Sequence, residues 1–157
     1  MAQPQPSLPE AALPVAAATE LPAARLLAQT AAWLMVIGLA TGGFAASAMT
    51  GQVAADAHAA LASHLNALLG ALWMLAVAYT LPMLRYGAVG QRRLALGLIV
   101  ANYANWLVTA VKAFLHVAGV GLDHDGTNNA VFGALTLLVV IPALGSALGW
   151  ALGFRRR

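Results

Sequence analysis

The sequence has 157 residues, of which 61% are hydrophobic and only 8% are charged, and it contains no cysteine. Soluble domains carry about 25% charged residues because their surface faces water, so this composition excludes a soluble globule and favours a protein embedded in lipid. The lack of cysteine excludes disulfides, thiolate metal sites and cysteine nucleophiles. The net charge of +3 comes from basic residues that are too few and too scattered for nucleic-acid binding.

The first 23 residues differ from the rest of the chain, with five prolines and two glutamates. Repeated proline interrupts a helix. The segment also lacks the basic start and the following apolar run of a secretory signal. We therefore expect residues 1–23 to be a disordered cytoplasmic tail, and residues 24–157 to form one membrane domain.

Four long apolar stretches follow the tail, at residues 26–49, 61–84, 94–120 and 130–154. Each is longer than the ~20 residues that a helix needs to cross a hydrocarbon core about 30 Å thick. Membrane β-strands would show an alternating pattern over ~10 residues, which these stretches lack. The sequence therefore predicts an all-α protein, a bundle of four transmembrane helices.

The positions of the basic residues predict the orientation of this bundle. Seven of the eight precede the first stretch, join the second to the third, or follow the fourth: Arg25, Arg85, Arg92, Arg93, Arg155, Arg156 and Arg157. The other two loops contain no lysine or arginine. Cytoplasmic loops of membrane proteins are enriched in both residues, so both termini are expected in the cytoplasm.

Small residues and prolines indicate how the helices pack. Gly38 and Gly42 form a G-x-x-x-G motif in the first stretch, and the fourth carries Gly145, Gly149 and Gly153 at the same spacing. Such glycines allow close approach of two helices, either within one chain or between copies, and the sequence leaves both open. Proline ends or bends a helix, so Pro82 is expected to end the second span and Pro142 to kink the fourth.

The third stretch carries five polar residues at spacings of 3, 4, 3 and 4: Asn102, Asn105, Thr109, Lys112 and His116. At about 100° per residue they fall within an arc of about 80°, one stripe along the helix. Polar groups inside a bilayer are costly, so an aligned stripe favours a polar pocket. Two alternatives are that the amides hold neighbouring helices together and that Lys112 and His116 extend to the outer interface.

The second stretch adds His64 and Asn66 near its outer end, at a depth similar to that of His116. A histidine in a span is a packing residue, a proton carrier or a haem ligand, and haem requires only one ligand from the protein. From the residues alone, a bis-histidine cytochrome using His64 and His116 stays open, as does a proton conductor using Lys112, His116 and the asparagines. No span contains a carboxylate, so acid–base chemistry by paired carboxylates is not supported.

Two segments carry a resemblance to a known family. Residues 64–84, HLNALLGALWMLAVAYTLPML, resemble the second span of styrene oxide isomerases, in which a histidine precedes an A-V-A-x-x-L-P ending. Residues 101–109, ANYANWLVT, resemble the third span of that family and still more that of the related hydroxylaminobenzene mutases. The resemblance implies a bacterial inner-membrane isomerase that forms a homo-oligomer such as a trimer, with ferric haem b bound between subunits and His64 as its axial ligand.

The resemblance also implies a substrate and roles for individual residues. A mutase would convert an aryl hydroxylamine, a small apolar aromatic compound, to an ortho-aminophenol, and the alternative is an epoxide substrate. Asn105 and Thr109 would hydrogen-bond the substrate, with Tyr103 or Trp106 near its ring. The isomerases have a substrate-positioning asparagine at the position of Gly70, and Asn66, Asn102 or Asn105 would replace it here. The isomerases' pocket tyrosine falls at Thr109, and both departures favour the mutase.

Overall fold

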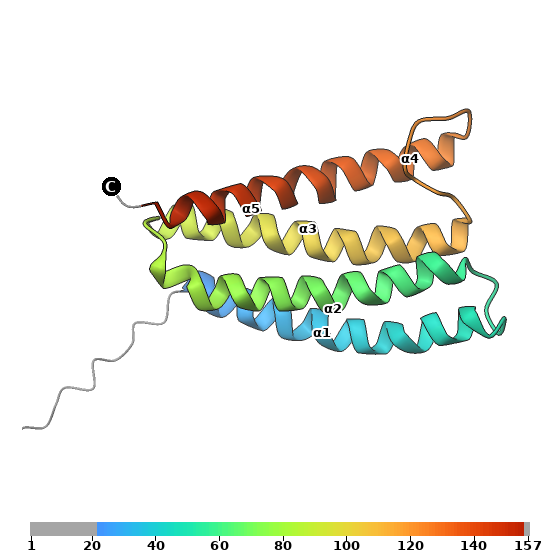
Figure 1. Cartoon of the computed structure of the whole chain (residues 1–157), viewed down its shortest axis with the longest axis horizontal. Coiled ribbons are helices and arrows are strands. Elements are labelled where there is room, and N and C mark those ends of the chain that lie inside the picture. Colours follow the sequence, from blue (N-terminus) through green and yellow to red (C-terminus); the bar gives the residue numbers. More distant parts are fainter. Residues whose placement is uncertain (1–21, 156–157) are drawn as a thin grey trace, which may run out of the picture.

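The computed structural model describes residues 22–155, which are helical apart from short loops (Figure 1). Its elements, in chain order, are α1 (Pro22–Met49), α2 (Ala57–Thr80), the 3-10 turn η1 (Leu81–Met83), α3 (Ala88–Leu115), α4 (Gly126–Ala134), the π-helical segment η2 (Leu135–Val140) and α5 (Ile141–Gly153). The last three are continuous and form one span, so the described chain contains four helices long and apolar enough to cross a membrane. The predicted all-α class and the four spans are confirmed.

The helix ends differ from the expected boundaries where side chains or turns cap them. α2 begins four residues earlier than expected because Asp56 accepts a hydrogen bond from the backbone N–H of Ala59 and so caps the first turn. α3 ends at Leu115 and not near residue 120, because His116 adopts a left-handed conformation with φ of 54°. Residues 1–21 of the expected tail lie outside the described chain, whereas Pro22 and Ala23 begin α1.

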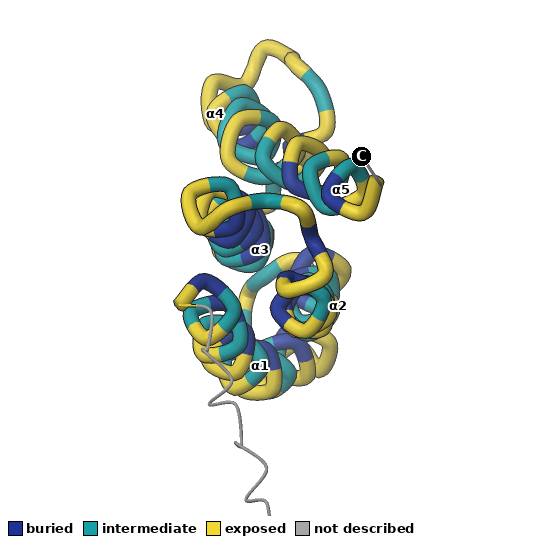
Figure 2. The backbone as a smooth tube through the Cα atoms, turned by 90° about the vertical axis from the view of Figure 1, so that its left-hand side faces the viewer, coloured by how far each residue is buried: buried dark blue, intermediate teal, exposed yellow. Residues whose placement is uncertain are grey.

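The helices are stacked in sequence order and do not form a square bundle (Figure 2). α1 and α2 pack closely, α3 lies against both, and the last span packs mainly on α3. A core of fully buried side chains joins the first three helices, including Leu27, Leu34, Met74 and Leu98. In an 18-residue apolar stretch of the last span only 11% of the residues are buried, whereas 28% to 39% are buried in the corresponding stretches of the other three spans. The last span therefore leaves most of its surface to lipid or to another protein.

The G-x-x-x-G motif of α1 serves packing within the chain. A Cβ added at Gly38 would lie 2.8 Å from Leu68 Cδ2 and 3.0 Å from Ala67 Cβ, both on α2. A Cβ at Gly145 in α5, in contrast, would meet nothing within 4 Å. The first motif therefore fixes α1 against α2, while Gly145 stays uncovered in the single chain.

We expect Gly38→Ala to destabilise the protein by about 1 to 3 kcal/mol, because the added methyl group overpacks a tight helix contact. Gly43→Ala is the matched control, since Gly43 lies on α1 with open space around its Cα. Thermal unfolding in detergent, followed by circular dichroism, measures both variants. Equal midpoints for the two would contradict the close contact.

Pro142 follows a stretch of the last span in which the helix geometry changes. Proline lacks an N–H, and in an α-helix its ring would meet the carbonyl of residue i−4. The preceding six residues widen into a π-helix, in which the N–H of Ile141 donates to the carbonyl of Thr136 five residues earlier. A π-helical bulge relieves the clash and changes the direction of the side chains around it.

Candidate functional site

A network of polar side chains joins α2 to α3 inside the membrane region. Asn66 Nδ2 donates to Asn105 Oδ1 at 3.1 Å and to Thr109 Oγ1 at 3.2 Å, and the Thr109 hydroxyl lies 3.5 Å from Asn105 Oδ1. Thr109 is only 4% exposed. The network does not use Asn66 Oδ1 or the two N–H donors of Asn105 Nδ2. Asn66, Asn105 and Thr109, three of the expected site residues, therefore meet and keep hydrogen-bonding capacity for a ligand.

A cavity of about 340 Å³ opens beside this network. Its lining comes from α2, α3 and the last span: Asn66, Leu69, Gly70, Trp73, Ala101, Asn102, Asn105, Val139 and Ala143. We call it the asparagine cavity. Five of these residues were not predicted as site residues from the sequence: Leu69, Trp73, Ala101, Val139 and Ala143. Trp73 lies seven residues after Asn66, two helical turns along the same face, and this spacing is the one signal that could have found it.

Asn102 lies against Gly70 on the wall of this cavity. An ideal Cβ at Gly70 would be 2.6 Å from Asn102 Oδ1, so the amide occupies the space that a side chain at position 70 would need. Asn102 is 6% exposed, and its Nδ2 donates to the carbonyl of Leu98 at 2.8 Å. Of the three residues considered as replacements for the asparagine missing at position 70, Asn102 is the one that packs on Gly70.

His64 faces α1. Its Nδ1 lies 2.7 Å from the carbonyl oxygen of Gly38, and its ring packs on Gly42, where a Cβ would be 3.1 Å from Cε1. A carbonyl only accepts hydrogen bonds, so Nδ1 carries the proton and Nε2 keeps its lone pair. Nε2 makes no hydrogen bond within residues 22–155, and since no partnerless polar side-chain atom is fully buried in that range, it reaches the surface of the chain.

This arrangement fits the expected haem ligand. Histidines that bind metals almost always donate their other ring N–H to a carbonyl or carboxylate, which fixes the tautomer and the direction of the free nitrogen. The Gly38 carbonyl provides such a partner for Nδ1. Metal sites made of several side chains are not present: the described residues contain no group of three or more His, Cys, Asp or Glu that could hold an ion. The geometry of His64 is compatible with a cofactor, such as haem, that needs one ligand from the protein.

The structure separates His64 from the polar stripe of α3. Two residues along a helix are separated by about 200°, so His64 and Asn66 lie on opposite flanks of α2. Their contacts agree, since His64 contacts Gly38 and Gly42 whereas Asn66 contacts Asn105 and Thr109. In a single chain the histidine and the asparagine cavity therefore belong to two separate surfaces.

Tyr103 and Trp106, the two aromatic residues expected near the ring of the substrate, form hydrogen bonds to α1 instead. Tyr103 donates its hydroxyl to the carbonyl of Thr30 at 2.9 Å, and Trp106 donates Nε1 to Thr41 Oγ1 at 3.0 Å. Neither lines the asparagine cavity. The structure thus uses both aromatics to hold α3 against α1 and does not bring them to the cavity.

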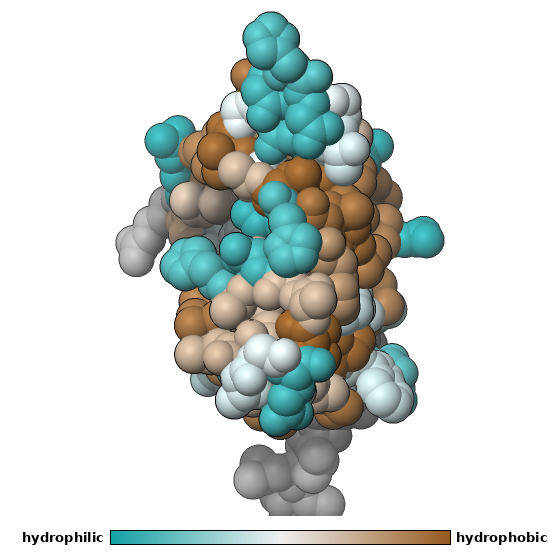
Figure 3. Space-filling model, turned by 90° about the vertical axis from the view of Figure 1, so that its right-hand side faces the viewer, coloured by the Kyte–Doolittle hydropathy of each residue, from teal (hydrophilic) through white to brown (hydrophobic). Residues whose placement is uncertain are grey.

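The outer half of the stripe lies at the end of the bundle, where hydrophilic side chains gather (Figure 3). Lys112 Nζ donates to the carbonyl of Ala118 at 3.1 Å, which agrees with the interpretation that this lysine extends to the interface. Lys112 and His116 line an outer cavity of about 480 Å³ together with Asp56 and His58. The placement of His116 within the third span is wrong, because the residue is exposed beyond the end of α3.

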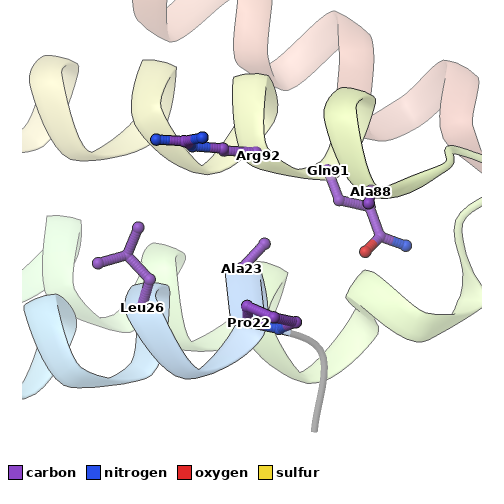
Figure 4. A pocket seen from close by; sticks show the side chains of 6 residues that line it. All are labelled: Pro22, Ala23, Leu26, Ala88, Gln91 and Arg92. Carbon is purple, nitrogen blue, oxygen red and sulfur yellow. The ribbon is translucent and has the colours of Figure 1, made fainter. Parts of the chain in front are cut away.

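A smaller cavity of about 200 Å³ lies at the opposite end of the bundle, between the first turns of α1 and α3 (Figure 4). Pro22, Ala23 and Leu26 face it from α1, and Gln91 and Arg92 from α3. The Gln91 amide donates to the carbonyl of Tyr86 at 3.1 Å and is therefore committed to the loop before α3. The lining contains no nucleophile and no acid–base pair, so this cavity is a weaker candidate for chemistry.

Comparison with known proteins identifies the family to which this fold and these polar groups belong. The family model described as styrene oxide isomerase matches residues 23–155, which is nearly the whole described chain. The chain belongs to the styrene oxide isomerase family. This match confirms the resemblance seen in the second and third spans, and it extends over all four.

Among curated proteins, the chain is similar to hydroxylaminobenzene mutase HabB from Ectopseudomonas oleovorans. The two are 36% identical over 102 residues, which is 64% of this chain and 58% of the relative. The match therefore spans less than two thirds of the relative's length. No solved structure gives a significant match.

Proposed function

We propose that this chain is a membrane isomerase that rearranges an aryl hydroxylamine to an ortho-aminophenol, with both termini in the cytoplasm of a bacterial cell. The nitrogen–oxygen bond breaks and a carbon–oxygen bond forms at the ortho carbon, which loses its hydrogen as a proton while the nitrogen gains a proton to become an amino group. Substrate and product are therefore isomers, and no external oxidant or reductant is needed. Family membership and the similarity to a hydroxylaminobenzene mutase support the class of reaction. The observation that carries the proposal is His64, with Nδ1 bound to Gly38 and Nε2 free.

His64 would hold haem b through Nε2. When bound, ferric haem supplies a Lewis acid that polarises the nitrogen–oxygen bond of the substrate. The Gly38 carbonyl keeps the imidazole in the required tautomer and rotamer, and Gly42 leaves room for the ring beside α1. Because these partners lie on α1, the first helix positions the ligand although it provides no ligand itself.

The network of Asn66, Asn105 and Thr109 would orient the substrate. Asn66 and Thr109 hold the Asn105 carboxamide by its oxygen, which directs the Asn105 N–H donors away from the network. These donors suit the oxygen of a hydroxylamine, on which lone pairs are available. A site inside the bilayer also suits the substrate, because small aromatic compounds partition into lipid and water is excluded there.

Self-association would complete the site. His64 and the asparagine network lie on opposite flanks of α2, so neither flank alone contains both the cofactor ligand and the substrate-binding groups. In a homo-oligomer such as a trimer, His64 of one copy can face the polar groups of the next. The exposed last span, with Gly145 uncovered, leaves the surface that such an assembly requires.

The activity is tested by incubating the purified protein with hydroxylaminobenzene, without added cofactor, and measuring 2-aminophenol by chromatography. We expect formation of 2-aminophenol at a rate proportional to protein concentration. Protein denatured by heat and the His64→Ala variant serve as controls for spontaneous rearrangement. Conversion no faster than in these controls would rule the proposal out.

The fit of His64 against α1 gives a separate prediction. We expect Gly42→Val to lower haem content about tenfold or more, because a side chain there would meet the imidazole ring and turn Nε2 away from its position. Gly43→Val, one residue away in open space, should retain haem. Absorbance in the Soret region per mole of purified protein measures both, and equal haem content would contradict the role of Gly42.

A further inference from the structure

Besides Asn66 Oδ1, the asparagine cavity is lined by a second hydrogen-bond acceptor, Asn102 Oδ1, that no group within residues 22–155 satisfies. The carbonyl of Leu98 can only accept, so the Asn102 atom that contacts it must be the amino group, and this fixes Oδ1 on the other side. Oδ1 is the atom directed at Gly70, and it makes no hydrogen bond within residues 22–155. Since no partnerless polar atom is fully buried in that range, Oδ1 is open to the cavity that Asn102 lines.

The rest of the cavity is suited to an aromatic ring. Leu69, Trp73, Val139 and Ala143 contribute apolar surface, and the volume of about 340 Å³ lies within the range of about 300 to 1,000 Å³ found for small-molecule sites. Leu69 is 63% exposed at the rim, so the cavity opens toward the bilayer. A small aromatic molecule can therefore enter from lipid and meet a carbonyl acceptor inside.

We propose that Asn102 Oδ1 accepts a hydrogen bond from an N–H or O–H group on a small aromatic ligand, and that this bond selects aryl hydroxylamines and aryl amines over epoxides. An epoxide has an acceptor oxygen but no donor, so it would leave Oδ1 without a partner in an apolar cavity. An unsatisfied polar group of this kind is costly, whereas a hydroxylamine has donors on both nitrogen and oxygen. Asn102 is then a positioning residue. The selection of aryl hydroxylamines as substrates rests on the proposed function. The preference for binding ligands that have an N–H or O–H donor does not.

Direct binding to the purified full-length protein tests this inference, with aniline and toluene as probes. The two molecules match in size, but only aniline has N–H donors. We expect Asn102→Leu, which preserves volume, to weaken aniline binding about threefold to tenfold, the value of one net hydrogen bond, and to leave toluene binding unchanged. The binding of each ligand is compared between the variant and the unmodified protein in the same detergent, so partition of the ligand into detergent affects both measurements equally.

Two further variants keep the test decisive. Gly70→Ala retains the amide but forces Oδ1 out of its place, so it should weaken aniline binding in the same way. Leu107→Ala, at a half-exposed position of α3 outside the asparagine cavity, should not change the effect of Asn102→Leu on either ligand. The same shift on Asn102→Leu should occur in a His64→Ala background, because Asn102 is held by Leu98 and Gly70 and not by His64.

Three results would overturn the proposal: no saturable binding of aniline to the unmodified protein, equal changes for aniline and toluene, or loss of the Asn102 effect in the His64→Ala background. Failure of the proposed function has a different signature. In that case hydroxylaminobenzene is not converted, yet aniline binding still depends on Asn102.

Discussion

Replacing His64 with alanine should remove nearly all haem from the purified protein and abolish isomerase activity. Nε2 of this residue is the free imidazole nitrogen that the structure holds in a fixed direction, through the 2.7 Å contact of Nδ1 with Gly38. In the proposed site His64 is the sole protein ligand of the haem, so we expect haem content to fall on the order of 100-fold in the variant, with a matching loss of turnover. The Soret absorbance per mole of protein and the rate of 2-aminophenol formation measure the two effects.

His116→Ala is the matched control for this experiment. His116 lies beyond the end of α3 and lines the outer cavity with Asp56 and His58, so its removal should leave haem content and activity unchanged. Loss of haem in both variants would instead favour the bis-histidine arrangement. Unchanged haem content in His64→Ala would remove the basis of the proposed mechanism.

Replacing Asn105 with alanine should lower kcat/KM about 10-fold to 100-fold while haem content stays the same. Asn105 accepts one hydrogen bond from Asn66, lines the asparagine cavity and has two N–H donors that the network does not use, so the variant loses the proposed bond to the substrate and the partner of Asn66. A lost hydrogen bond in a site that excludes water costs about 1 to 3 kcal/mol, which corresponds to this range of rate. Steady-state kinetics with hydroxylaminobenzene measure the effect.

A double-mutant cycle distinguishes a direct role of Asn105 from general damage. Asn66→Ala and Asn105→Ala remove the two ends of one hydrogen bond, so their combined effect on kcat/KM should be smaller than the sum of the single effects. Leu107→Ala on the same helix should leave kcat/KM unchanged. Full additivity of the two asparagine variants would indicate that the network does not act as a unit.

The sequence was sufficient to predict the fold, because the length and apolar composition of each span identify it. In a bilayer, such spans can form only helices or closed β-barrels. It was also sufficient to place Asn105 and Thr109 on one face of α3. It did not show that His64 turns away from them, because the rotation of α2 is set by its tight contact with Gly38 and Gly42, a property of packing and not of hydropathy.

Two other features were hidden for similar reasons. The role of Trp73 depends on which flank of α2 meets α3, and Val139 reaches the cavity from a π-helical segment of a kind that hydropathy does not reveal. The end of α3 at Leu115 was missed because a single left-handed residue, His116, stops a helix within an apolar stretch. Polarity and spacing thus indicated candidate residues such as Asn66, Asn105 and Thr109, while close packing decided which of the candidates meet.

The central claim is that the protein moves one hydroxyl group within one molecule. It is tested most directly by converting hydroxylaminobenzene that carries an isotope-labelled hydroxyl oxygen, in ordinary water, and measuring the label in 2-aminophenol by mass spectrometry. An isomerase that holds the substrate in a site from which water is excluded should retain the label in nearly all of the product. Product that contains oxygen from water in place of the label would contradict intramolecular transfer and the function proposed for this chain.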